Sequence, residues 1–192
     1  MTFATSQGLQ SANREEREAK IREFVSTALV VHRAKSASEP MIISLLARGP
    51  DSPAARALAG MADELIAANV TVTAVLLDLD TFTDEPGRAS VLDMANADVR
   101  LLSDPRFASA HEQMVLGASI MWLGDCMRRD PAKRDAFELF HHDDAKATAN
   151  ATISFSRLQA IAQDVRRVRS LAPQMMVSGS FAEPLSVTLT RR

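Results

Sequence analysis

One stretch of the chain places a histidine, an amide and a carboxylate where two paired strands could bring them together. It reads "HEQMVLGASIMWLGD", with His111 first, Gln113 two residues later and Asp125 last. Imidazole can act as a nucleophile or a general base near neutral pH. Asp125 could hold His111 in one tautomer, which would suit a general base. The alternative is a buried histidine at the start of a strand, satisfied by hydrogen bonds and without chemistry.

A basic loop follows this stretch. It reads "CMRRDPAKRD" and contains Arg128, Arg129, Lys133 and Arg134. Because arginine binds phosphate oxygens through paired hydrogen bonds, Arg128 and Arg129 could supply positive charge to a site at His111. The simpler interpretation is a solvated loop, since Asp130 and Asp135 are interleaved with the cations. The loop could equally bind a partner protein.

Two further stretches contain metal-ligand residue types without metal-ligand spacing. In "HHDD" (141–144) the histidines are adjacent, so on a strand their side chains point to opposite faces. Asp143 or Asp144 is expected to cap the helix that follows. The acidic stretch "LLDLDTFTDE" (76–85) lacks the spacing and the glycine of a calcium-binding loop. We therefore predict no metal and no cofactor.

The first half of the chain has the pattern of a βαβ unit preceded by a helix. The helical pattern begins at Asn13 and ends between residues 34 and 38. "MIISLLA" (41–47) and "VTVTAVLLDLD" (70–80) are apolar runs typical of buried strands. Between them, Ser52 is the expected N-cap of a helix that starts at Pro53. Strand, helix and strand in this order predict parallel neighbours.

The second half predicts a hairpin and a closing helix. "VRLL" (99–102) is a third strand, and "EQMVLG" and "SIMWLGD" form a hairpin with a turn at Gly117–Ala118. "AFELFHH" (136–142) is a further strand. The helix after it has an apolar stripe that continues to Val168, and "LSVTLT" (185–190) could pair as an edge strand. Trp122 and the scattered methionines are expected in the core or, for Trp122, at a dimer contact.

These patterns predict an α/β fold: a mixed β-sheet with flanking helices and an extra N-terminal helix. We expect a polar segment and helix at 1–39, one α/β domain at 40–172 and a tail at 173–192. The length of 192 residues suits one domain, and the net charge of −2 gives no general attraction to nucleic acid or to anionic membranes. The single Cys126, the absence of a signal sequence and the lack of a spanning apolar run favour a soluble, cytoplasmic protein.

The order of these elements resembles a phospholipase D-like half-domain, over roughly residues 40–163. The quoted resemblances are "MIISLL…ALAGMADELIAANVTVTAVLLD", "VRLL", "HEQMVLG…SIMWLGD" and the helix ending "SFSRLQAIA". In that superfamily the hairpin carries H-x-K-x4-D and then a G-S-x-N-like strand end. The histidine position falls on His111. The other four motif residues are replaced. The lysine position falls on Gln113, the aspartate position on Gly117 or Ala118, the serine position on Asp125 and the asparagine position on Met127.

The resemblance implies a metal-independent phosphodiester site formed where two such motifs meet, which for one half-domain means a homodimer. Removing a single transition-state donor typically costs about 10²–10³ in rate, and several are missing here. We therefore favour a catalytically impaired domain that binds or scaffolds. The alternatives are a divergent phosphodiesterase or nuclease that uses His111 across a dimer interface with Arg128 or Arg129, and a small-molecule sensor that uses Gln113 and Asp125.

Overall fold

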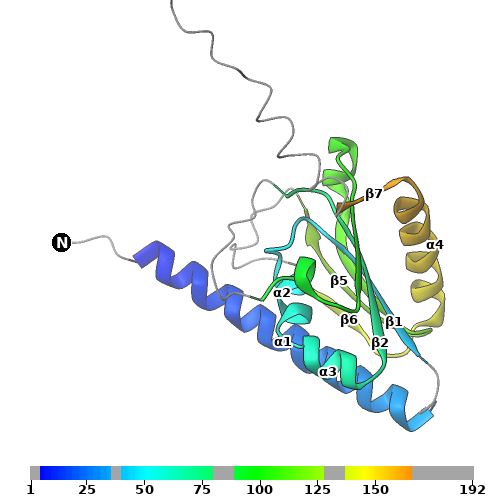
Figure 1. Ribbon diagram of the computed structural model, residues 1–192. Coiled ribbons are helices and arrows are strands. Elements are labelled where there is room, and N and C mark those ends of the chain that lie inside the picture. The colour runs from blue at the N-terminus through cyan, green and yellow to red at the C-terminus, as the bar shows by residue number, and fades with distance from the viewer. Residues whose placement is uncertain (1–4, 36–39, 80–88, 128–136, 166–192) are drawn as a thin grey trace, which may run out of the picture.

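A mixed β-sheet separates two layers of helices in the computed structural model (Figure 1). The structure describes residues 5–35, 40–79, 89–127 and 137–165. On one face lie α1 (Thr5–Lys35), α2 (Pro53–Ala59) and α3 (Ala62–Ala67), and α4 (Ala145–Ile161) covers the other face. The predicted α/β fold with a mixed sheet, flanking helices and an N-terminal helix is confirmed.

Within the described residues the sheet has seven strands. Their order across the sheet is β6-β5-β4-β1-β2-β3-β7. β1 runs parallel to β2, and β2 to β3, whereas the other neighbouring pairs are antiparallel. The strands are β1 (Met41–Ala47), β2 (Val70–Leu76), β3 (Ala97–Leu101), β4 (His111–Leu116), β5 (Ile120–Cys126), β6 (Leu139–His141) and β7 (Gln163–Asp164).

Both faces of the sheet are apolar, which explains the nearly continuous apolar runs of β1 and β2. Ile43 and Trp122 pack with Val25 of α1 on one face. Leu46 and Val75 pack with Phe155 of α4 on the other. Trp122 is fully buried, and the four methionines that the sequence assigned to the core are also buried: Met41, Met61, Met94 and Met121.

The predicted helix caps are present. The Ser52 hydroxyl accepts a hydrogen bond from the Ala55 N–H at 3.2 Å, with Pro53 at the first helical position. The sequence did not distinguish between Asp143 and Asp144 as the N-cap of α4. Asp144 is the cap, and its carboxylate accepts from the Ala147 N–H at 2.8 Å.

Several element boundaries differ from prediction. Helix α1 begins at Thr5 and not at residue 13, because a helix propagates beyond its buried stripe and the apolar pattern marks only that stripe. The helix after β1 divides into α2 and α3 at Gly60, a residue of low helix propensity. β2 ends at Leu76, four residues early.

The end of α4 is also a correction. The sequence extends its apolar stripe to Val168, but the helix ends at Ile161. Gln163 and Asp164 instead pair with Leu101 and Arg100 of β3 as the short strand β7. Main-chain pairing with a sheet edge therefore takes precedence over helical periodicity here.

Some predictions fall on other parts of the chain. The basic loop around Arg128 and Arg129, the strand at 185–190 and the proposed tail at 173–192 lie outside the described residues. In the described ranges no helix has both the length and the apolar character needed to cross a membrane.

Candidate functional site

His111 lies at the edge of the sheet where three strand ends meet. It is the first residue of β4 and pairs with Cys126, the last residue of β5. One step further in, Gln113 pairs with Leu46 near the end of β1. Because β4 is antiparallel to both neighbours, its start meets their carboxyl ends. The end of β1, the end of β5 and the start of β4 therefore form one edge.

The His111 ring is held in a defined orientation. Its Nδ1 lies 2.9 Å from the carbonyl oxygen of Gly124. A carbonyl only accepts, so Nδ1 carries the proton and, in the neutral ring, Nε2 is left with its lone pair. The ring also makes an edge-to-face contact with Phe137, with centroids 6.1 Å apart. His111 is exposed, which corrects the interpretation of it as a buried strand-start histidine.

A β-bulge in β5 brings the Gly124 carbonyl to His111. Gln113 pairs with Leu123 but His111 pairs with Cys126, so β5 contains one more residue than β4 between these pairs. A Cβ atom added at Gly124 would lie 2.4 Å from Cη2 of Trp122. The indole thus occupies the space that a side chain would need. The bulge at Gly124 was not predicted from the sequence, although a glycine inside a strand pattern is a signal for one.

Asp125 has a different role from the one predicted. Its carboxylate accepts hydrogen bonds from the backbone N–H of Cys126 at 2.7 Å and of Phe137 at 3.4 Å. It thereby ties the bulge to the segment that enters β6. The group that orients His111 Nδ1 is the carbonyl of Gly124 and not the carboxylate of Asp125.

Gln113 shares a strand face with His111. Side chains alternate along β4, and Val115, two residues on, packs against Ala151 of α4. His111 and Gln113 therefore lie on the α4 side, and Gln113 is half-buried. The structure brings His111, Gln113 and Asp125 to one edge, whereas Arg128 and Arg129 lie outside the described residues.

The residue between His111 and Gln113 was not singled out by the sequence analysis. Glu112 points to the opposite face, where it is 7% exposed. Its carboxylate accepts a hydrogen bond from the backbone N–H of Arg48 at 3.0 Å. Burial raises the pKa of Glu112, and the Arg48 hydrogen bond and the charge of Arg17 oppose that shift. A charged residue inside an apolar strand was the available signal.

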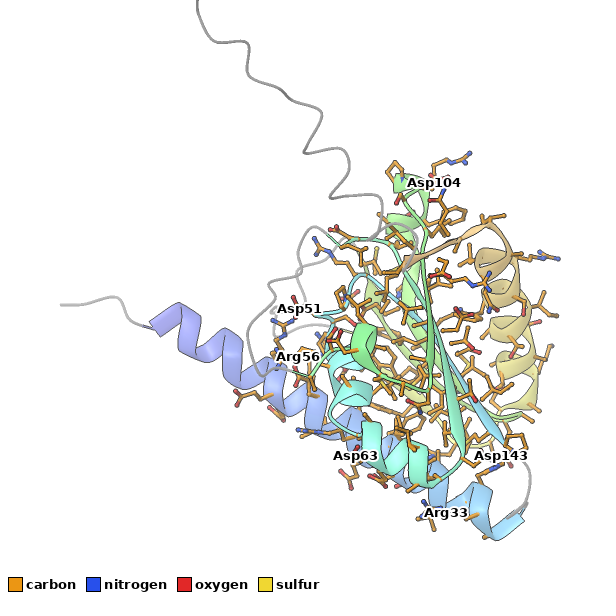
Figure 2. The ribbon with its side chains drawn as sticks, in the orientation of Figure 1. Arg33, Asp51, Arg56, Asp63, Asp104 and Asp143 are labelled. Atoms are coloured by element: carbon orange, nitrogen blue, oxygen red, sulfur yellow. The ribbon has the colours of Figure 1, made fainter. Side chains whose placement is uncertain are left out.

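The "HHDD" stretch lies away from this edge. Asp104, which caps the short 3-10 helix Pro105–Ser109 just before β4, lies at one end of the molecule, and Asp143 lies at the other (Figure 2). His141 approaches Asp144 at 3.6 Å, and the ring of His142 packs against Phe24 of α1. Among the described residues, no group of three or more metal-ligating side chains is arranged to hold an ion.

Comparison with solved structures adds a distant similarity of fold. No protein-family model matches the chain, and no curated protein matches its sequence. Among solved structures, the chain is similar to NucT from Helicobacter pylori, with 11% sequence identity and a TM-score of 0.48. The match covers 76% of this chain and 93% of that chain. At this distance it carries no argument about activity or partners.

Proposed function

We propose that this chain is a phospholipase D-like half-domain that has lost catalysis and acts by binding, as a homodimer. The proposal combines the resemblance in element order with the composition of the His111 edge. In phospholipase D-like half-domains, a lysine and an asparagine accompany the histidine of the motif. Here the corresponding positions hold Gln113 and Met127, and Asp125 adds a carboxylate.

The observation that carries the proposal is the place of Asp125. It follows Gly124, whose carbonyl fixes His111, and its carboxylate is bonded to backbone N–H groups at the same edge. A carboxylate at the same edge of the sheet as the histidine disfavours both the binding of a phosphodiester anion and the charge that develops in phosphoryl transfer. Gln113 remains as a neutral hydrogen-bonding group. This combination favours retained binding over retained catalysis.

A second function is favoured by a different observation. His111 is exposed, and in its neutral ring the hydrogen bond of Nδ1 leaves Nε2 with its lone pair, which is the tautomer that a nucleophilic Nε2 needs. An active, divergent phosphodiesterase with two His111 rings across a dimer axis is therefore the second candidate. In that case Arg128 and Arg129 would supply the missing charge.

Hydrolysis of bis(4-nitrophenyl) phosphate, with chelator present, separates the two functions. For the binding domain we expect no release of nitrophenolate above background from the wild type or from His111→Ala. Hydrolysis by the wild type that is lost in His111→Ala would overturn the first proposal and establish the second. In that event Arg128→Met and Arg129→Met should each lower the rate of hydrolysis below that of the wild type. Lys146→Met is the control, because Lys146 is exposed at the start of α4, and it should change the rate less.

The dimer is tested separately by light scattering over a range of protein concentrations. We expect a mass of twice 20.9 kDa. A monomeric mass at all concentrations would contradict the dimer and, with it, any composite site of two His111 side chains.

A further inference from the structure

A cluster of charged side chains is buried beneath the candidate site, on the face that α1 covers. Arg17 of α1 is 5% exposed, and its Nε lies 3.1 Å from Oε1 of Glu138. Glu138 immediately precedes β6, and its side chain is 14% exposed. Glu112 of β4 is buried as well and accepts from the Arg48 N–H. Four segments far apart in the sequence thus contribute charges to one interior region.

Arg17 is the cation that α1 contributes to this cluster, through its ion pair with Glu138. Besides its ion pair with Glu138, its charge lowers the pKa of Glu112, as the charge of Arg48 does, whereas Glu138 raises it. An isolated buried carboxylate is costly and either takes up a proton or moves toward water. Arg17 and Arg48 together therefore allow Glu112 to remain inside as a hydrogen-bond acceptor.

Helix α1 holds Arg17 firmly in this position. Glu18, the next residue, pairs with Arg56 of α2 at 2.9 Å, and Arg56 and Asp51 lie beside the N-terminal half of α1 (Figure 2). Further along α1, Ile21 and Val25 are fully buried in the core. Any displacement of this half of α1 would therefore withdraw Arg17 from the cluster.

We propose that Arg17 is a positioning residue that couples α1 to the orientation of His111. Glu138, the ion-pair partner of Arg17, is the covalent neighbour of Phe137, and the Phe137 ring makes the edge-to-face contact with His111. When Arg17 is withdrawn, Glu138 is left as a largely buried carboxylate without its ion pair and moves toward water. The Phe137 ring then shifts from its contact with His111, and the His111 bond to the Gly124 carbonyl loosens. The functional meaning rests on the role of His111 in the divergent phosphodiesterase, the second candidate function, but the coupling itself needs no ligand.

The test is the ring nitrogen NMR spectrum of His111 at about pH 8, where an ordinary histidine is neutral. Each ring signal is assigned by its loss in His111→Ala. In the wild type we expect the Nδ1–H tautomer alone. Arg17→Met should give a mixture of the two tautomers and lower the Tm by on the order of 10 °C. Lys20→Met is the control, because Lys20 lies on the same helix in an exposed pair with Glu16 and should change neither.

Rescue separates positioning from simple stability. Adding Glu138→Gln to Arg17→Met removes the carboxylate that needs the cation, so the single His111 tautomer should return. A wild-type ring spectrum in Arg17→Met would overturn the proposal and leave Arg17 as a structural partner of Glu138. A mixture that persists in the double variant would also overturn it. If Arg17→Met does not fold, Arg17→Gln, which also removes the charge, is measured with the same two outcomes. Failure here leaves the hydrolysis result untouched, because no ligand is present.

Discussion

Glu112 shows how a single buried carboxylate can act against the stability of a fold. It lies in an apolar strand, and desolvation is the largest influence on its pKa, which is raised above the ordinary value of 4.5. A carboxyl whose pKa is higher in the folded state binds its proton more tightly there. Its contribution to stability is therefore fully present below pH 4.5 and is lost as the pH rises through the folded pKa.

We predict that Glu112→Gln stabilises the protein at neutral pH by on the order of 1 kcal/mol. The carbonyl oxygen of the new amide side chain can still accept from the Arg48 N–H, and the cost of burying a charge is removed. The gain should shrink to nothing as the pH falls below 4.5, where Glu112 is protonated as well. Urea unfolding at a series of pH values measures this. A loss of stability at neutral pH would mean that the attraction of Arg17 and Arg48 outweighs desolvation.

Gly124→Ala should destabilise the protein by roughly 1–3 kcal/mol, because the new methyl group would overlap the indole of Trp122. Trp122→Leu removes those ring atoms, so the same exchange should cost less in that background. A double-mutant cycle by urea unfolding measures the coupling. Gly60→Ala is the matched control, since its nearest neighbour would be 3.4 Å away and its backbone is helical. Equal costs of Gly124→Ala in both backgrounds would contradict this account.

The His111 edge was only partly predictable from residue types. His111, Gln113 and Asp125 do lie at one edge, because the hairpin and its strand directions follow from the alternation and the turn residues. The partner of His111 did not follow, since a bulge decides which carbonyl reaches the ring. Glu112 was missed because its burial depends on α1, which packs from almost 100 residues away in the sequence.

At the scale of the element, the start of α4 allows a matched comparison of two adjacent aspartates. Asp144 accepts from the Ala147 N–H, whereas Asp143 is exposed. We predict that Asp144→Ala lowers the free energy of unfolding by about 1 kcal/mol and that Asp143→Ala changes it by less than about half of that. Urea unfolding measures both. Equal effects would show that net charge near the helix start, and not the cap, is what matters.

Strands and caps followed from local sequence, whereas helix ends did not. Met41–Ala47 is a strand as predicted, because its apolar run is followed by turn residues and most of its side chains are buried. Ser52 and Asp144 are recognisable caps because a side-chain oxygen satisfies a nearby N–H. The start of α1 lies beyond the apolar stripe that marks this helix in the sequence, and the end of α4 depends on a partner that local periodicity does not contain. For α4 that partner is the edge of β3.

At the scale of the whole molecule, the sheet is made of two locally connected parts. The β1–β2–β3 part is parallel and the β4–β5–β6 part is antiparallel, and in the described sheet the ladder between β1 and β4 joins them. His111 lies on the strand at this junction. An edge built from the ends of β1, β4 and β5 is therefore complete only when both parts are in place.

This junction has a consequence for how the chain folds. The pairing of Ile43 with Leu116 closes a much longer loop than the turn within the β4–β5 hairpin does. Loop closure of this kind costs entropy before any contact compensates for it, so such pairings tend to form late. We therefore expect the two parts to gain structure first and the β1–β4 ladder to close afterwards. Until then β1 and β4 each expose an unpaired strand edge, and the nascent protein is most prone to aggregate at these two strands.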